Sequence, residues 1–309
     1  MGIKDPGHHK YDGELIPYDA ILPELDGNKP HPLVYRPIAE NLNEHANKFP
    51  FQQHKFFNHM ASSQAANINL FLPIIYSNRA ESVLQSVKPD IRDIAVKELD
   101  NGYRIEYFDE GLSSLGDKNQ STGTDSDIAI AYYNHEGELC LWLIEHKLTE
   151  AEFTTCGGYR SSGRDKKKHL CESSFNTILN NKDLCYYHDK SGYNYWKITE
   201  KNKAFFKNDS AWKSCPFKGG MNQLWRNQLM GLAIEESTEL PYKHVYFSVV
   251  HHPENHALDK TLEEYKELIA NNPNFSVFTS DKLVAEAKKQ EMPRLNTWAR
   301  WYTELYNII

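Results

Sequence analysis

The chain has no long apolar run and no apolar leader. Of its 309 residues, 40% are hydrophobic and 25% are charged, which is ordinary for a soluble globular protein. The longest apolar stretches, near Leu70 and Leu139, are far shorter than the ~20 residues that a membrane-spanning helix needs. The first residues, MGIKDPGHHKYDG, lack the apolar core of a signal peptide, and Pro6 stands where a myristoylation signal requires Ser or Thr. We therefore expect a cytoplasmic protein that does not contact a membrane.

Glycine motifs for nucleotide binding are also missing. The chain contains neither a Walker phosphate-binding loop nor a Rossmann fingerprint, which disfavours the enzymes that depend on these motifs. It has no internal repeat and no heptad pattern, which disfavours solenoids and coiled coils. Its 309 residues suffice for one large α/β domain with an insertion, or for two small domains.

Positive charge is scarce overall but concentrated in one region. The chain has 35 Lys and Arg against 42 Asp and Glu, a net charge of −7. Between Cys156 and Gly220 there are 13 basic and six acidic residues, a net charge of +7, so the remainder carries −14. This distribution suits an enzyme that grips phosphate locally and repels it elsewhere. The best candidates for phosphate contacts are Arg160, Arg164, Lys166, Lys167 and Lys168. The alternative is that these residues are only a charged run exposed to solvent.

The most informative stretch runs over residues 124–147, TDSDIAIAYYNHEGELCLWLIEHK. Its first part, residues 128–133, alternates like a strand, and a polar turn follows at residues 134–138. Residues 139–144 are then apolar on both faces, which is typical of a central strand covered on both sides of a sheet. The sequence therefore predicts a β-hairpin whose second strand is buried.

That buried strand ends in Glu145-His146-Lys147. Residues two apart on a strand point to one face, so Glu145 and Lys147 share a side, and Asp127 opens the partner strand beside them. Two carboxylates suit Mg²⁺, and a lysine can orient a water and hold phosphate charge. A surface ion pair is the alternative, but it explains poorly why the triplet follows the most hydrophobic strand of the chain.

The triplet Asp127, Glu145 and Lys147 resembles the active site of the PD-(D/E)XK phosphodiesterases, which include restriction endonucleases and RecB-type exonucleases. Four sequence segments resemble a family of bacterial restriction endonucleases of that superfamily: SSQAANINLFLPI, TGTDSDIAIAYYN, LIEHKLTEAE and NQLWRNQLMGLA. The resemblance runs from about residue 45 to the end. It implies a restriction-endonuclease-like α/β fold, a central mixed sheet flanked by helices. It also implies that Asp127, Glu145 and the carbonyl of His146 hold Mg²⁺ or Mn²⁺ while Lys147 positions the attacking water.

The resemblance adds residues from a predicted helix that begins near Gly219. In the RecB-like branch, a helix after the E-x-K strand brings a glutamine to the active site, and Gln223 matches this glutamine. The tyrosine expected four residues later is Asn227 here, which departs from the RecB motif. Arg226 on the same helix is a candidate phosphate ligand.

Two further positions bear on the site. Gln64, in a helix predicted over residues 58–71, is a candidate beside the metal or the substrate, and the alternative is a helix that only packs on the sheet. Glu106 or Glu110 could supply another metal ligand, and nothing in the sequence selects between them.

Four of the five cysteines fall in the basic segment. This segment has little aliphatic content, and such segments are often stabilised by a bound metal or by disulfides. Disulfides are disfavoured in the cytosol. The cysteines are 15, 14 and 30 residues apart without a CxxC pair, so clustering favours a metal more than spacing does. Some nucleases of the resembled superfamily carry an iron–sulfur cluster on four cysteines, so the resemblance favours [4Fe–4S] or Zn²⁺. Free thiols are the alternative, and the nearby His169 and His188 could substitute in a zinc site. The cysteines are Cys156, Cys171, Cys185 and Cys215.

The C-terminal third alternates between strand and helix. Strands are expected at residues 243–251 and 275–279, and helices at residues 258–270, 280–289 and 295–306, with Ser280 capping the second of these helices. This order completes an α/β sheet.

These observations predict an N-terminal arm over residues 1–48 and a nuclease domain over residues 49–309, with a Cys-rich basic insertion at residues 153–220. The expected function is metal-dependent cleavage of DNA, in restriction or phage defence together with protein partners. One alternative is a non-catalytic nucleic-acid-binding or assembly subunit on a nuclease scaffold, and another is a zinc-stabilised interaction module. The sequence leaves open whether DNA or RNA is cut, whether cutting starts at an end, and how many chains assemble.

Overall fold

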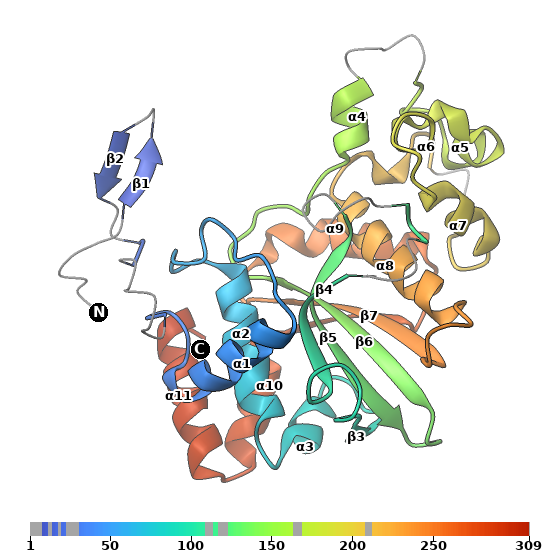
Figure 1. The fold of residues 1–309 in the computed structure, drawn as a ribbon. Helices are drawn as coiled ribbons and strands as arrows, with labels where there is room; N and C mark the ends of the chain where they lie inside the picture. Colours follow the sequence, from blue (N-terminus) through green and yellow to red (C-terminus); the bar gives the residue numbers. More distant parts are fainter. Residues whose placement is uncertain are drawn as a thin grey trace.

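A mixed sheet between two layers of helices organises the chain (Figure 1). The structure, a computed structural model, describes residues 8–11, 14–17, 20–22, 31–108, 114–116, 123–162, 169–207 and 212–308. The first two strands, β1 (His8–Tyr11) and β2 (Glu14–Pro17), form a hairpin of their own. Within the described ranges, none of the helices combines the length and the apolar composition of a bilayer span.

The main sheet has six strands in the order β3–β5–β6–β7–β8, with β4 pairing along β5 as well. The pairs of β3, β4 and β6 with β5 are antiparallel, whereas β7 and β8 continue the sheet in parallel. The predicted mixed α/β architecture is therefore confirmed. The strands are β3 (Ile91–Ile94), β4 (Tyr103–Phe108), β5 (Asp125–Asn134), β6 (Leu139–Lys147), β7 (His244–His251) and β8 (Phe275–Thr279).

Strands β5 and β6 form the hairpin that the sequence predicts. Ile128 pairs with Ile144 at one end and Tyr133 with Leu139 at the other. The turn places Gly137 at φ 82°, a left-handed conformation that glycine adopts without a steric penalty. Residues 140–144 of β6 are completely buried, so β6 is the central strand that its two apolar faces indicated.

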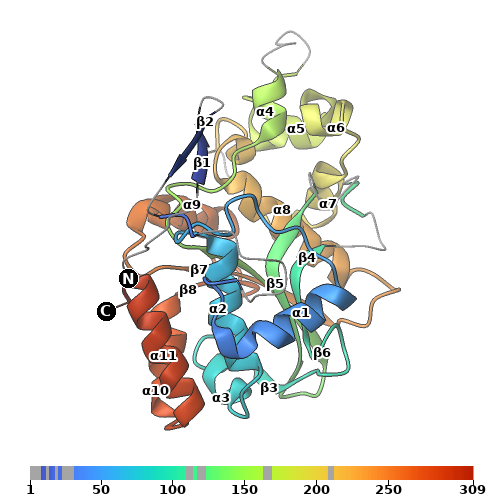
Figure 2. The same ribbon diagram turned by 60° about the vertical axis from the view of Figure 1, so that its left-hand side comes forward.

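One face of the sheet is covered by α2, with α10 and α11 beside it (Figure 2). The buried Asn69 of α2 ties this layer together, because it accepts a hydrogen bond from the backbone of Tyr35 and donates to Leu33 and to the Tyr306 hydroxyl. Part of the chain ahead of residue 49 thus also belongs to this core. The helices of this layer are η1 (Arg36–Ile38), α1 (Ala39–Lys48), α2 (Ser63–Ile75), α3 (Ala80–Leu84), α10 (Ser280–Lys289) and α11 (Pro293–Tyr306).

The other face is covered by α8 and α9, and the insertion packs on α8. Trp225 of α8 stacks on Phe217 with ring centroids 4.0 Å apart, and its indole N–H donates to Thr199 at 2.9 Å. The aromatic residues of the insertion therefore supply the core that its few aliphatic residues could not. The elements are α4 (Gly157–Ser162), α5 (Phe175–Asn180), η2 (Lys182–Leu184), α6 (Tyr186–Asp189), α7 (Tyr195–Lys201), η3 (Pro216–Lys218), α8 (Met221–Glu235), η4 (His256–Leu258) and α9 (Asp259–Leu268).

The predicted helix cap at Ser280 is wrong. Thr279 is the N-cap residue of α10, in an extended conformation and without a side-chain capping bond, while Ser280 is already helical and buried. Strand β8 runs directly into α10, so the chain turns one residue earlier than the serine indicated.

Candidate active site

Asp127, Glu145 and Lys147 meet where β5 and β6 of the hairpin lie side by side. Lys147 Nζ lies 2.8 Å from Glu145 Oε1, and these two residues are only 7% and 4% exposed. Because Ile128 pairs with Ile144, Asp127 lies opposite Glu145, and its Oδ2 accepts the backbone N–H of His146 at 2.6 Å. The fold thus gathers the three residues that the sequence pattern singled out.

Helix α8 fixes both oxygens of Glu145. Gln223 Nε2 donates to Glu145 Oε1 at 2.7 Å, and Asn227 Nδ2 donates to Oε2 at 2.9 Å. Residues four apart share a helix face, so one turn of α8 supplies both donors. Gln223 also accepts the backbone N–H of Thr154, just beyond β6, at 3.0 Å. Asn227 occupies the position where the RecB motif has tyrosine.

Strand β4 adds a further carboxylate through a kink in its backbone. Ile105 pairs with Ile128 and Tyr107 with Ser126, which leaves Glu106 opposite Asp127. Glu106 has φ 49°, a left-handed value that is rare for a residue with a side chain. In a regular strand the side chains of Ile105 and Tyr107 would share a face, but here they belong to the two hydrophobic cores on opposite faces of the sheet. Such an outlier often marks a functional site.

The N-terminal part of α2 contacts this cluster from the other layer. Gln64 Nε2 donates to Glu106 Oε1 at 2.7 Å, and Asn67 Nδ2 donates to the backbone carbonyl of Asp127 at 3.0 Å. Gln64 is 1% exposed and also accepts the backbone N–H of His54 at 2.9 Å. Gln64 therefore lies next to the carboxylates and is itself buried from solvent.

Negative charge is crowded at this site. Burial and then the charge of Asp125 raise the pKa of Glu106 to about 8, and burial and then the charge of Glu145 raise the pKa of Asp125 to about 6. Burial and then Glu145 and Glu106 raise the pKa of Asp127 well above its usual range. Four carboxyl groups that disfavour one another's charge are a typical setting for a divalent cation.

Lys147 stays cationic in this setting. Burial alone lowers its pKa, but the carboxylates of Glu145 and Asp127 raise it more, so the pKa ends above its ordinary value. A lysine in this state carries a positive charge and donates hydrogen bonds, and it does not accept a proton near neutral pH. It therefore suits the stabilisation of anionic oxygens.

The oxygen donors of the site suit a hard cation, although they are not yet arranged as a coordination site. Carboxylate oxygens are the ligands that Mg²⁺ and Mn²⁺ take most readily. Among the residues that the structure describes, no group of three or more His, Cys, Asp or Glu is already arranged to hold a metal ion. Glu145 instead satisfies its oxygens with Lys147, Gln223 and Asn227, and it would have to exchange one of these contacts.

His146 contributes its backbone only. By strand alternation its side chain shares the face of Trp142 and Ile144, which belong to the core on the α2 side. It is 1% exposed, and neither ring nitrogen has a hydrogen-bond partner in the described part of the chain. Burial, and then the charges of Lys147 and His251, lower its pKa to about 3. The imidazole is therefore neutral and turned away from the carboxylates.

The predicted phosphate-binding residues are dispersed. Arg226 donates to Thr124 Oγ1 at 3.0 Å and to the carbonyl of Gly123, so it holds the chain where it enters β5. Arg160 is exposed on α4. Four predicted residues of the basic run and one candidate metal ligand lie outside the described residues: Arg164, Lys166, Lys167, Lys168 and Glu110.

Sequence reasoning missed Asp125 and the role of Asn227. Asp125 is two residues before Asp127, so strand alternation alone could have placed both on one face. Asn227 was noted four residues after Gln223, but only as a departure from a motif. The hydrogen bond from Asn227 to Glu145 depends on how α8 packs, which no local pattern reveals.

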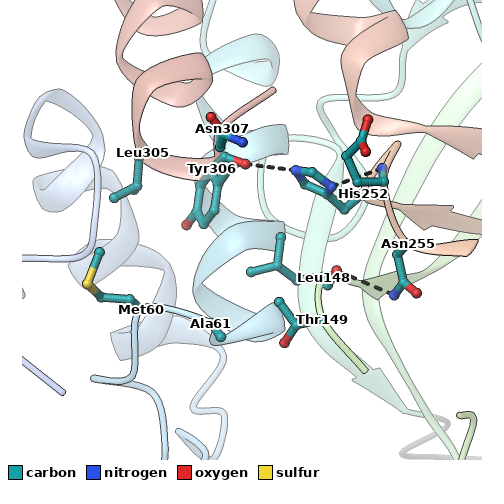
Figure 3. A pocket seen from close by; sticks show the side chains of 10 residues that line it. Met60, Ala61, Leu148, Thr149, His252, Asn255, Leu305, Tyr306 and Asn307 are labelled. Carbon is teal, nitrogen blue, oxygen red and sulfur yellow. Dashed lines mark hydrogen bonds between the residues drawn. The ribbon is translucent and has the colours of Figure 1, made fainter. Parts of the chain in front are cut away.

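A pocket of about 450 Å³ lies beside the site but not at the carboxylates (Figure 3). Leu148 and Thr149, which follow Lys147, line one side, and Tyr306 and Asn307 line another. His252 Nε2 lies 2.7 Å from the backbone oxygen of Tyr306 and braces the rim. None of the four carboxylates of the candidate site lines this pocket.

In the metal-free protein, the Glu106 carboxyl is expected to stabilise the fold at low pH only. Its folded pKa of about 8 lies above its unfolded value of 4.5, so the stabilisation is complete below 4.5 and is lost as the pH rises through 8. Urea denaturation in EDTA at pH 5, 6.5 and 8 should show wild type losing stability relative to Glu106→Gln across this window. A difference between the two proteins that stays constant with pH would contradict the raised pKa.

Comparison with protein-family models gives a match over most of the chain. Residues 3–307 match the family described as restriction endonuclease associating with ARP. No curated protein and no solved structure matches the chain. The match spans nearly the whole sequence, including the hairpin, the insertion and both helical layers.

Proposed function

We propose that this chain, which belongs to the family of restriction endonucleases associating with ARP, is a metal-dependent nuclease that hydrolyses phosphodiester bonds of DNA. The family match supports a nuclease-related role for the chain. The finer assignment, to the RecB-like branch of the PD-(D/E)XK superfamily, is supported by the hairpin triplet and Gln223. The observation that carries the proposal is the convergence of Asp127, Glu145 and Lys147 on a buried hairpin.

Asp127 and Glu145 would hold Mg²⁺ or Mn²⁺ together with the backbone carbonyl of His146. When bound, the metal would make a water more acidic and offset negative charge on the phosphate. Glu106 and Asp125 are further carboxylates within the same electrostatic environment, since each raises the pKa of a neighbour or is raised by one. A cation would relieve the repulsion among all four groups.

The other residues of the site would orient and stabilise. Lys147 is held as a cation by Glu145 and Asp127, so it would donate to the attacking water and to the phosphate oxygens as negative charge develops. Gln223 and Asn227 each hold one oxygen of Glu145 and would fix the direction of this ligand. Gln64 would hold Glu106 in the same way.

Replacing Asn227 with alanine is expected to weaken Mn²⁺ affinity by about 10- to 100-fold, the usual cost of losing a group that orients a metal ligand. Asn227 donates to Glu145 at 2.9 Å and is 2% exposed, so alanine leaves that carboxylate oxygen without its donor. Isothermal titration with Mn²⁺ measures the change. The matched control is Gln228→Ala on the same helix, because Gln228 is 1% exposed and its side chain has no partner within the described ranges. Equal Mn²⁺ affinity in the two variants would remove Asn227 from the site.

DNA is the proposed substrate because the basic segment after β6 offers local positive charge to phosphates. This segment carries a net +7 in a chain of net −7, and Arg160 within it is exposed. The family description speaks of association with ARP. We therefore propose that the chain acts together with a protein partner, in restriction or phage defence.

The proposal is tested by incubating the purified protein with circular and linear DNA, single- and double-stranded, and with RNA of the same sequence. Each substrate is tried with Mg²⁺, with Mn²⁺ and with EDTA. Cleavage that requires the metal establishes the nuclease, and products from circular DNA identify an endonuclease. DNA binding without cleavage of any substrate, in folded protein with metal present, would favour the non-catalytic binding subunit instead.

A further inference from the structure

The four cysteines of the insertion occupy similar positions at the starts of short elements or in turns. Cys156 directly precedes α4, Cys185 is the N-cap residue of α6, and Cys215 is the N-cap residue of η3. Cys171 lies in a turn ahead of α5. All four are buried, with exposed fractions of only 8–9%. None forms a disulfide.

Contacts between the segments bring these cysteines together. The backbone N–H of Cys156 donates to Lys218 O at 3.3 Å, which joins the start of α4 to the Cys215 turn. Cys171 Sγ lies 3.9 Å from Leu184 O, directly before Cys185. A Cβ at Gly157 would lie only 2.9 Å from the Tyr187 hydroxyl, so α4 and α6 begin against each other.

The sulfur atoms influence one another electrostatically. Burial, and to a smaller extent the charges of the other thiolates, raise the pKa values of Cys156, Cys185 and Cys215, that of Cys156 to about 12. Every pair among the four cysteines contributes to one of these shifts. These interactions agree with the contacts that bring the four segments together.

Backbone N–H groups already point at these sulfurs. The N–H of Tyr159 donates to Cys156 Sγ at 3.3 Å. The N–H groups of Tyr187 and His188 lower the pKa of Cys185, and that of Phe217 lowers the pKa of Cys215, although burial outweighs them. Hydrogen bonds to sulfur stabilise thiolates and tune metal–thiolate centres.

Buried polar atoms without partners lie beside the same cysteines. Thr155 Oγ1 and His169 Nδ1 have no hydrogen-bond partner among the described residues. Thr155 and His169 are within two residues of Cys156 and Cys171 in the chain, and the Trp196 N–H lowers the pKa of Cys185. Buried unpaired polar atoms are rare in native proteins, so the two next to Cys156 and Cys171 in the chain agree with a binding role for this region.

We propose that Cys156, Cys171, Cys185 and Cys215 form a four-thiolate centre that binds Zn²⁺ or a [4Fe–4S] cluster. Four thiolates are the usual ligand set of both. Among the described residues, no group of three or more His, Cys, Asp or Glu side chains is already arranged to hold a metal, and this includes the four cysteines. Binding of Zn²⁺ therefore requires the four thiols to release four protons and turn toward the ion. The centre would fasten α4, α6 and η3 into one unit.

The test is the metal content and visible spectrum of protein purified without oxygen. Wild type is expected to carry about one zinc per chain without colour, or about four iron with matching sulfide and a visible absorption band. Cys185→Ser is expected to lose at least about nine-tenths of this metal. The matched control is Cys140→Ser, because Cys140 is completely buried in β6 and none of the other cysteines contributes to the shift that burial produces in its pKa. Wild type without metal, or Cys185→Ser with the wild-type content, overturns the inference.

A second measurement covers the case in which Cys185→Ser fails to fold. Wild type is titrated with a mercurial reagent while a dye reports released metal. The four-thiolate centre predicts that metal is released in step with the reaction of about four thiols. Thiols that react without any release of metal overturn it. Neither readout involves DNA cleavage, so the outcome is independent of the proposed nuclease activity.

Discussion

Replacing Lys147 with alanine is expected to lower the rate of DNA cleavage by about 10²- to 10³-fold, the cost of losing one donor to a developing oxyanion. Lys147 is the cation 2.8 Å from Glu145, and it keeps its charge because the carboxylates around it raise its pKa above normal. Cleavage of fluorescent DNA under saturating Mg²⁺ measures the loss. The change should fall on kcat, because the lysine acts on charge that develops in the transition state.

The control for this variant is another buried, paired lysine. Lys88 is 8% exposed and pairs with Asp90, as Lys147 is 7% exposed and pairs with Glu145. Removing either should destabilise the fold, by about 1–3 kcal/mol, because each carboxylate loses its charged partner and keeps only neutral hydrogen-bond donors. Lys88→Ala should therefore share the loss of stability and keep its activity below the unfolding transition. A Lys147→Ala enzyme with wild-type activity would remove this lysine from the mechanism.

Replacing Asp127 with asparagine is expected to abolish cleavage while it stabilises the metal-free protein at pH 8. Burial and the charges of Glu145 and Glu106 raise the pKa of Asp127, so the native state resists its ionisation. Asparagine removes that charge and keeps an oxygen to accept the N–H of His146, which Asp127 binds at 2.6 Å. The gain should be on the order of 1 kcal/mol in urea denaturation with EDTA, since active-site groups often reduce stability.

A carboxylate in the opposite situation provides the control. Burial raises the pKa of Asp90, but Lys88 and the Tyr132 hydroxyl lower it more, so its folded-state charge is favourable. Asp90→Asn should therefore lower stability at pH 8 by on the order of 1 kcal/mol and leave cleavage intact. If Asp127→Asn loses stability in EDTA as Asp90→Asn does, the repulsion at the candidate site is absent.

The hairpin could be predicted because its pattern is local. Alternation along residues 128–133 and two apolar faces over residues 139–144 define β5 and β6, and complete burial of residues 140–144 follows from the same pattern. The strand pairing then puts Asp127 opposite Glu145 without further information. The later strands and helices were also predictable, because each is a short apolar-periodic run between polar loops.

The rest of the site depends on packing between distant segments. Glu106 takes its position from a backbone with φ 49° in β4, which sequence patterns do not reveal. Asn227 reaches Glu145 across 82 positions of sequence, and Gln64 reaches Glu106 across 42. Arg226 was predicted to bind phosphate from its residue type alone, whereas in the fold it holds Thr124 and Gly123. Such contacts depend on how α2 and α8 are placed on the sheet.

The measurement that tests the central claim most directly is cleavage of DNA by wild type and Glu145→Gln in parallel, with Mn²⁺ and with EDTA. Glutamine keeps the size of the side chain and removes the charge that two amides and Lys147 hold in place. The account predicts cleavage by wild type with Mn²⁺, none with EDTA, and none by folded Glu145→Gln under either condition. Cleavage by Glu145→Gln at the wild-type rate would contradict it, since the hairpin carboxylates would then not carry the reaction.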